Sequence, residues 1–145
     1  VWNDTAPTNS VFSLGSNGDV NTSGRTYIAY CFAEKIGYSK MGTYVGNGNS
    51  NGNFLYTGFR PSWFLVKRTA QEAWILTDSQ RGFPQSWNYL IPNTNGSEQG
   101  GLPYDFVSNG IKFRGTTQNE SGSTYAYMIF GQTLVGSNNI PCTAR

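Results

Sequence analysis

The fold is decided by residues 62–78, which read SWFLVKRTAQEAWILTD. Two runs of aromatic, aliphatic and β-branched residues, Ser62–Thr69 and Ala73–Asp78, lie on either side of the short polar segment 70–72. Two such runs joined by a short polar turn are the pattern of a β-hairpin. We therefore predict that these two strands pair with each other.

The residues of the first strand indicate how that hairpin is covered. Because successive side chains of a strand point to opposite faces, Phe64 and Val66 share one face. Trp63 and Leu65 share the other face. Large apolar side chains on both faces favour two central strands in a covered sheet. We predict a two-layer antiparallel β-sandwich, jelly-roll-like, with long Gly- and Asn-rich loops.

The rest of the chain shows the same all-β pattern. No stretch has a sustained helical spacing of apolar residues, and short β-forming runs recur between clusters of Gly, Asn, Ser and Pro. Asn109 and Gly110 form an Asn-Gly pair that favours a tight hairpin turn. The other predicted strands are Val11–Leu14, Thr26–Glu34, Ser39–Val45, Asn53–Phe59, Tyr104–Val107, Ile111–Arg114 and Thr124–Gln132.

Two long segments are predicted to be loops. Residues 46–53 contain Gly, Asn and Ser with no side chain suited to a core, which indicates an exposed loop. Residues 81–102 are long for a connection in a sandwich and carry several aromatic residues among prolines and polar residues. Such a loop is usually packed or functional.

An internal repeat relates the two ends of the chain. Asn21–Tyr27 reads NTSGRTY and is followed by Phe32, while Asn119–Tyr125 reads NESGSTY and is followed by Phe130. Both matches have the same offset along the chain. The same unit of a turn and an aromatic strand is therefore written twice. Chance similarity of two Ser-Gly turns is the alternative.

The repeat also predicts how the chain is organised. Residues 11–14 and 110–113, upstream of the two turns, are related as well. The chain begins at Val1 and not at Met, which suggests a processed product or a fragment of a longer chain. We expect one β-sandwich domain over residues 1–145, in which 1–34 is the closing hairpin of one repeat, 39–132 is a second full repeat and 133–145 is a C-terminal tail.

Composition excludes several classes of function. The chain has no His, so Ser/His, Cys/His and His-metal sites are impossible. Its formal net charge is only +2 and its basic residues are scattered, so no nucleic acid partner is indicated. No segment has the length and apolarity of a membrane span. Cys31 lies in an apolar run far from Cys142 and is predicted to be a buried small hydrophobe.

The remaining candidates for chemistry are carboxylates and Asn-rich turns. Glu34, Asp78 and Asp105 lie near predicted strand ends and are the candidates for a pair of acids in glycoside hydrolysis. No two of them share a motif, so we expect ion pairs or turn caps, and predict no catalytic residue. Residues 17–19 and Asn21 could bind calcium, but a turn held by Asx hydrogen bonds fits them better. No metal and no cofactor is predicted.

Aromatic and amide side chains are the best candidates for binding. Their flat rings and paired donors and acceptors suit polar, uncharged ligands such as sugars. The alternative role of the rings is packing in the core or between subunits. The predicted ligand-binding residues, all in the long segment, are Trp87, Asn88, Tyr89, Asn93 and Asn95.

Several motifs resemble a repeated module of tail-fibre-like and other virion structural proteins of marine bacteriophages. They are Asp19–Glu34, Tyr56–Pro61, Phe64–Arg68, Asp105–Phe113 and the C-terminal Ser137–Arg145. The resemblance implies a β-sandwich repeat on the virion without enzymatic activity. It supplies no catalytic or ligand residues.

These observations together favour a non-enzymatic virion surface or tail-fibre module that attaches to host glycans or to other virion subunits. A purely structural capsid-decorating or tail-stabilising subunit is the alternative, and a carboxylate-based depolymerase is the least favoured. The many aromatic residues favour a homo-oligomer, a trimer if the chain belongs to a fibre. The expected location is the virion, assembled in the host cytoplasm, with no nucleic acid and no membrane partner.

Overall fold

The computed structural model describes residues 3–70, 72–81 and 87–132, with only the backbone of Trp87. The chain divides into two compact units, Val1–Phe32 and Ala33–Arg145. The tail 133–145, including Cys142, lies outside the described residues.

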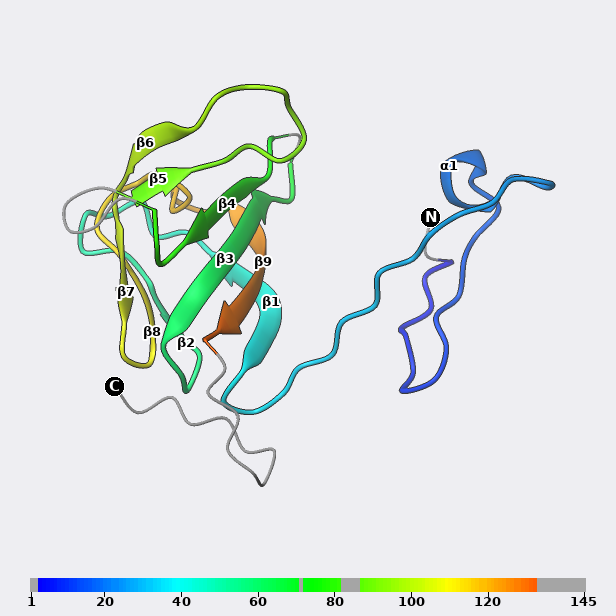
Figure 1. The fold of residues 1–145 in the computed structure, drawn as a ribbon, viewed down its shortest axis with the longest axis horizontal. Helices are drawn as coiled ribbons and strands as arrows, with labels where there is room; N and C mark the ends of the chain where they lie inside the picture. The colour runs from blue at the N-terminus through cyan, green and yellow to red at the C-terminus, as the bar shows by residue number, and fades with distance from the viewer. Residues whose placement is uncertain (1–2, 71, 82–86, 133–145) are drawn as a thin grey trace. The chain divides into compact units, whose positions relative to one another are not determined.

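The second unit is an antiparallel β-sandwich (Figure 1). Its four-stranded sheet has the order β1-β9-β3-β4, its three-stranded sheet has the order β2-β8-β7, and β5 pairs with β6. The bounds are β1 Ser39–Val45, β2 Phe54–Tyr56, β3 Pro61–Arg68, β4 Ile75–Asp78, β5 Trp87–Tyr89, β6 Gln99–Leu102, β7 Tyr104–Val107, β8 Gly110–Phe113 and β9 Thr124–Gly131. The predicted all-β class and sandwich are confirmed.

An aromatic core holds the two layers together. Phe64 of β3 is fully buried and meets Tyr104 of β7 edge-on, with 5.5 Å between the ring centroids. Phe113 of β8 is also fully buried and lies 6.4 Å from the Phe64 ring. Burying each such side chain contributes about 1.5–3 kcal/mol, and edge-on ring pairs add to that. These rings join residues from three strands into one core.

The two predicted hairpins are present. β3 pairs with β4, with Leu65 opposite Leu76, and β7 pairs with β8 across a two-residue turn at Ser108 and Asn109, with Gly110 as the first residue of β8. β3 is internal as predicted, and its Val66 is fully buried. The prediction that both strands are central is wrong for β4, which ends the order of the four-stranded sheet. A single bridge to Leu90 beside the β5–β6 hairpin partly covers that edge.

The observed secondary structure differs from the prediction in three segments. Residues 11–14 and 26–34 are not assigned to strands, because local β preference does not by itself supply a neighbouring strand. In the other direction, β5 and β6 form within the predicted loop 81–102. The pairing of those two short strands could not be read from their mixed polar and Gly-rich sequence.

Residues 46–53 form a loop whose Asn47, Asn49, Ser50 and Asn51 are exposed, as predicted, but a buried side chain from elsewhere in the chain anchors it. Asn119 is fully buried beneath this segment. Its Nδ2 donates to Asn47 Oδ1 at 2.8 Å and to the Asn49 carbonyl at 3.1 Å, and its Oδ1 accepts from Asn47 N at 3.1 Å. A buried amide therefore takes the place of an apolar anchor.

The first unit contains one short helix, α1 (Gly18–Asn21). Asn17 Oδ1 accepts a hydrogen bond from Asp19 N at 2.8 Å and so begins the helix. The Asx turn that the sequence favours is therefore present. Cys31, predicted to be buried, is exposed in this unit, because the residues around it have no covering strand layer.

Candidate functional site

The predicted binding residues lie around the β5–β6 hairpin. Asn88 Nδ2 donates to Glu98 Oε1 at 3.0 Å, and Tyr89 Oη donates to Gln99 Oε1 at 2.6 Å. The Tyr89 ring is partly buried against the core. Both side chains therefore tie β5 to the segment that contains β6.

Among the described residues, no recorded side-chain contact joins the other predicted binding residues to Asn88 or Tyr89. Asn93 Oδ1 accepts from Trp74 N at 3.1 Å and so fastens the loop to the start of β4. Asn95 is exposed. The backbone of Trp87 pairs with Leu102, whereas the side chain of Trp87 lies outside the described residues.

The three candidate acids each have a local partner. Glu34 Oε1 accepts from Met41 N at 2.9 Å. Asp78 pairs with Arg81 at 2.5 Å, and Asp105 pairs with Arg114 at 2.6 Å. These are turn caps and ion pairs, as the sequence favours. Both arginines lie within nine residues of their acids, and the intervening turns bring them back to the carboxylates.

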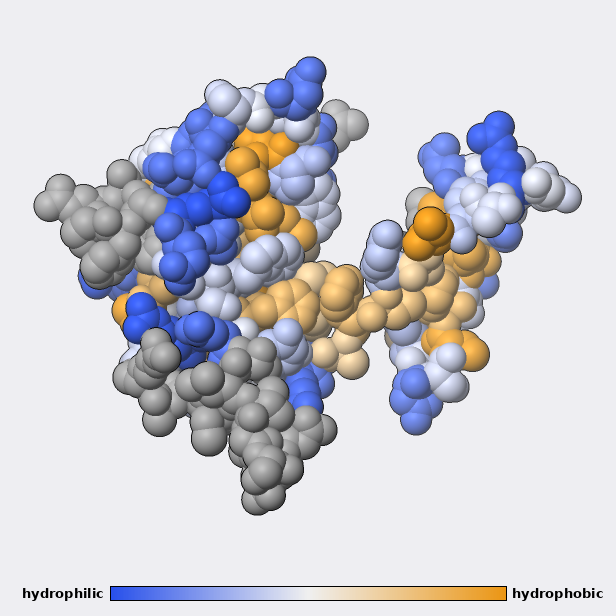
Figure 2. All heavy atoms as spheres, in the orientation of Figure 1, coloured by the Kyte–Doolittle hydropathy of each residue, from blue (hydrophilic) through white to orange (hydrophobic). Residues whose placement is uncertain are grey.

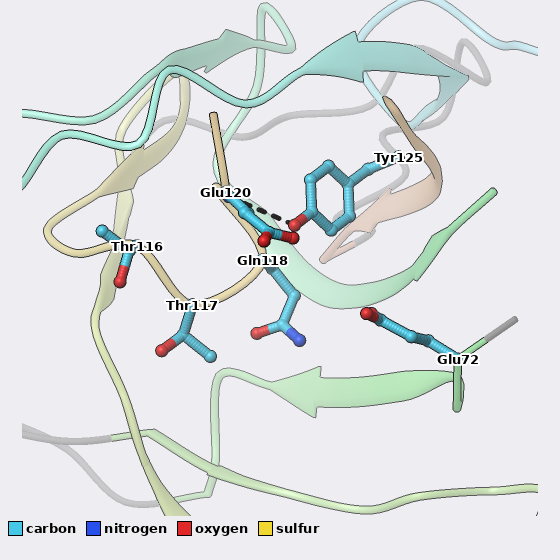
Figure 3. A pocket seen from close by; sticks show the side chains of 6 residues that line it. All are labelled: Glu72, Thr116, Thr117, Gln118, Glu120 and Tyr125. Atoms are coloured by element: carbon cyan, nitrogen blue, oxygen red, sulfur yellow. Dashed lines mark hydrogen bonds between the residues drawn. The ribbon is translucent and has the colours of Figure 1, made fainter. Parts of the chain in front are cut away.

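A second group of polar side chains lines a hollow away from the β5–β6 hairpin (Figure 3). A hollow of about 310 Å³ is bounded by Glu72 on the β3–β4 connection and by the segment that leads into β9. The side chains of Glu72, Thr117 and Gln118 point toward one hollow in this view. Its lining residues are Glu72, Thr116, Thr117, Gln118, Glu120 and Tyr125, which we call the Gln118 pocket.

Arg68 holds the two carboxylates beside the pocket. Its Nη1 lies 2.9 Å from Glu72 Oε1 and 2.6 Å from Glu120 Oε2. The hydrogen bond to Glu72 and the nearby charge of Glu120 raise the pKa of Arg68 above its ordinary value. Ser123 Oγ donates to Glu120 at 3.1 Å. Arg68 therefore fixes both carboxylates in place and balances their charge. Glycoside hydrolysis instead requires two acids that flank the bond to be cleaved.

Gln118 is the distinctive residue of this pocket. Its backbone has a φ of 52°, in the left-handed region, and its carbonyl accepts from Tyr44 Oη at 2.5 Å. Its side-chain Oε1 is buried, and no described residue donates to it. A buried acceptor of this kind normally receives a hydrogen bond. A hydroxyl of a ligand or of water entering the pocket fits that requirement.

Sequence reasoning missed the Gln118 pocket. The polar run 116–119 precedes a repeated turn, which was a signal, but Glu72 comes from a hairpin far away in the chain. Only pairing of β9 with β3 brings these two segments together. The pocket offers hydroxyl, amide and carboxylate groups, which together suit a hydroxylated ligand.

Other kinds of site have little support in the described part of the chain. Among residues 3–70, 72–81 and 88–132, no cluster of three or more acidic or Cys side chains could hold a metal ion. No described helix has the length and apolar character to cross a membrane.

The chain belongs to the family described as Domain of unknown function (DUF7483), whose model matches residues 1–133. No curated protein and no solved structure matches the chain. The family therefore covers both units without assigning an activity to either.

Proposed function

We propose that the chain is a non-enzymatic module of a bacteriophage virion surface or tail fibre, and that it attaches to host-surface glycans. The motif resemblance supports the virion assignment. The observation that carries the attachment role is the Gln118 pocket, where a buried amide oxygen without a described donor lies among hydroxyl and carboxylate groups. Sugar hydroxyls donate and accept hydrogen bonds and match such a lining.

The scaffold supports this role by holding the pocket in place. Tyr125 is buried at the start of β9, and its Oη accepts from Glu120 N at 3.2 Å. Tyr44 holds the Gln118 carbonyl from the neighbouring strand β1. Loops fixed by a rigid sheet are the usual position of binding residues.

The β5–β6 hairpin remains a second proposed contact surface. Asn95 is exposed there, and an aromatic ring at Trp87 would supply stacking surface for a sugar. Asn88, Tyr89 and Asn93 act in our proposal by holding this hairpin, since each makes a hydrogen bond within it or to its neighbour.

Adsorption of the full chain to host cells tests the proposal, with free sugars as competitors. Thr117→Val and Gln118→Met keep side-chain size but remove the hydroxyl and the amide. We expect each variant to weaken adsorption by roughly two- to tenfold, because one lost hydrogen bond is worth about 0.5–1.5 kcal/mol. Trp87→Ala should weaken adsorption more than Asn88→Ala if the hairpin also contacts the ligand.

Melting curves and light scattering provide the controls. Thr5→Val alters a comparable hydroxyl, which donates to the Asn3 carbonyl and lies outside both the pocket lining and the β5–β6 hairpin, and should leave adsorption unchanged. Unchanged adsorption by Thr117→Val and Gln118→Met with intact folds would remove the pocket from the binding surface. Lost stability of Trp87→Ala would assign that ring to packing.

A purely structural role on the virion is the second candidate. The exposed Ile28 and Tyr30 favour it, because large apolar side chains in water mark assembly surfaces. In that case no variant changes adsorption, and light scattering shows a homo-oligomer, with a trimer expected for a fibre. A depolymerase would instead lose hydrolysis on Glu34→Gln, Asp78→Asn or Asp105→Asn while keeping its fold.

A further inference from the structure

The repeated turn has the same hydrogen bonds in both units. In the first unit, Thr22 N donates to Tyr27 Oη at 2.9 Å. In the second unit, Glu120 N donates to Tyr125 Oη at 3.2 Å. Each pair has the same spacing, and each tyrosine is the second residue after the turn. The repeat in sequence is therefore also a repeat in local structure.

The backbone of the turn agrees in detail. Arg25 N donates to the Thr22 carbonyl at 3.2 Å, and the equivalent bond, from Ser123 N to the Glu120 carbonyl, is 3.1 Å. The glycine in each turn is in the left-handed region, with φ of 75° at Gly24 and 74° at the equivalent Gly122. Such agreement does not follow from shared composition alone, because a left-handed glycine fixes the direction in which the chain leaves the turn.

The segment after the turn differs between the two units. In the second unit the turn leads into β9, which lies between β1 and β3 and pairs with both. In the first unit the equivalent residues 26–31 are not assigned to any strand. Ile28 is 79% exposed and Tyr30 is 81% exposed. Figure 2 shows such hydrophobic residues on the visible surface of this unit.

The offset of the repeat assigns each residue of this segment a place in β9, and the exposed Ile28 and Tyr30 correspond to Ala126 and Met128, which are partly buried. Tyr27 corresponds to Tyr125, which is buried, and Cys31 corresponds to Ile129, which is fully buried. A related reversal lies upstream, where the offset between the two units is one residue longer. Thr8 N donates to the Val11 carbonyl at 2.8 Å, closing a reversal like the one at which Val107 pairs with Gly110. The first unit thus matches the last third of the sandwich.

We propose that residues 26–32 are the last strand of a second copy of this sandwich. In that copy, the strands equivalent to β1 and β3 lie on either side of residues 26–32, as β1 and β3 lie on either side of β9. The face of this strand that carries Cys31 would then point into the core of the second copy. An apolar strand that is central in one copy of a module requires neighbours on both edges in the other copy, because its backbone hydrogen-bonding groups and its apolar side chains otherwise stay in water.

The occupant to which we commit is a copy of the β1–β6 part that precedes the first unit on the same polypeptide. In the second unit β9 already fills the place between β1 and β3, over the whole pairing from Ser39 to Val45. A second molecule of this chain therefore has no vacant place to offer. A preceding copy that lacks its own last strand has a vacant place between its equivalents of β1 and β3. The order of elements along the chain is then the same in both copies.

The test extends the full chain and measures the reactivity of Cys31. A copy of residues 33–99 is placed directly before Val1, which the match of the upstream reversal at residues 8–11 with residues 107–110 aligns with residue 100. Both proteins carry Cys142→Ser, so that Cys31 is the sole thiol. We expect an aromatic disulfide reagent to label Cys31 about a hundredfold or more slowly in the extended chain, because a fully buried thiol reacts only when the module opens.

A matched control moves the thiol to the turn. Ser23 corresponds to Ser121, which is exposed. In a background of Cys31→Ser, the thiol of Ser23→Cys should label at the same fast rate with and without the extension. Equal rates for Cys31 in the two proteins overturn the proposal. Slow labelling of the unextended chain that depends on concentration, with a dimer mass, points to a second molecule and also overturns it.

A second variant tests the equivalence without the extension. Residues 124–130 (TYAYMIF) are replaced by the sequence of residues 26–32 (TYIAYCF), with Cys31→Ser and Cys142→Ser elsewhere. Gly131 stays, because a Cβ there would lie 2.7 Å from the Phe59 ring. We expect a cooperative melt and a thiol at position 129 that labels about a hundredfold more slowly than Cys31 of the unextended chain. A non-cooperative melt or a fast-reacting thiol overturns the equivalence.

Discussion

Replacing Asn119 by Ala should strongly destabilise the second unit. Asn119 is fully buried, and its Nδ2 lies within 3.1 Å of three acceptors: Asn47 Oδ1, the Asn49 carbonyl and the Gly115 carbonyl. An amide nitrogen has two hydrogens, so one of these three bonds is shared. Adding the bond that Oδ1 accepts from Asn47 N gives three to four bonds in effect.

Each of these bonds contributes about 1 kcal/mol net, so Asn119→Ala should lower the free energy of unfolding by about 3–4 kcal/mol. For a unit of this size, each kcal/mol corresponds to roughly 4–8 °C in Tm. The expected fall in Tm is therefore between roughly 12 and 32 °C. Urea denaturation followed by tryptophan fluorescence measures the free energy, and calorimetry measures Tm.

The repeat supplies a matched control. Asn21 occupies the equivalent place in the first unit, where it is exposed and donates to the Gly15 carbonyl at 3.0 Å. Asn21→Ala should change the main unfolding transition by less than about 0.5 kcal/mol. If Asn119→Ala also costs less than about 1 kcal/mol, the buried amide does not hold the 46–53 loop, and our account of that loop fails.

Two further predictions concern close contacts and buried hydroxyls. Gly46→Ala should destabilise the second unit by about 1–3 kcal/mol, because the new Cβ would lie 2.2 Å from the Glu120 carbonyl oxygen. In the same denaturation assay Gly96→Ala should be near neutral, because the nearest atom to its new Cβ is 3.5 Å away. Equal effects of the two substitutions would contradict the packing. Burial raises the pKa of both Tyr44 and Tyr104. Their folded-state pKa values exceed the unfolded value near 10, so this stability is complete below about pH 10 and is lost above it, at about 1.4 kcal/mol per pH unit for each tyrosine. Denaturation at pH 9–11 measures the slope, which Tyr44→Phe should reduce by one tyrosine's share; a free energy independent of pH up to 11 would show that neither hydroxyl is shielded.

Much of the second unit could be predicted because its strands are locally periodic. The bounds of β1 and β7 agree with the prediction, and the predicted hairpin of β7 and β8 is present, although its turn is at Ser108 and Asn109 and Gly110 begins β8. β5 and β6 could not be predicted, because QGGL has no alternation of apolar residues. Their pairing depends on contacts that the local pattern does not encode.

The Gln118 pocket could not be predicted from the sequence. The predicted binding residues lie in the segment 81–102, whereas the residues that meet in one hollow come from the β3–β4 connection and from the segment before β9. Gln118 gave no signal of its own. A buried acceptor without a described donor is a property of the packed molecule and not of the residue type.

By itself the sequence determined that the chain has no His chemistry, that its strands and turns make an all-β sandwich, and that one turn-and-strand unit occurs twice. The tertiary structure decided that β9 lies between β1 and β3, that Asn119 is buried, and that Ile28 and Tyr30 face water. The physical reason is that a strand's sequence carries its own alternation of faces but not the identity of its neighbours. Two related segments can therefore be a core strand in one unit and an exposed segment outside any strand in the other.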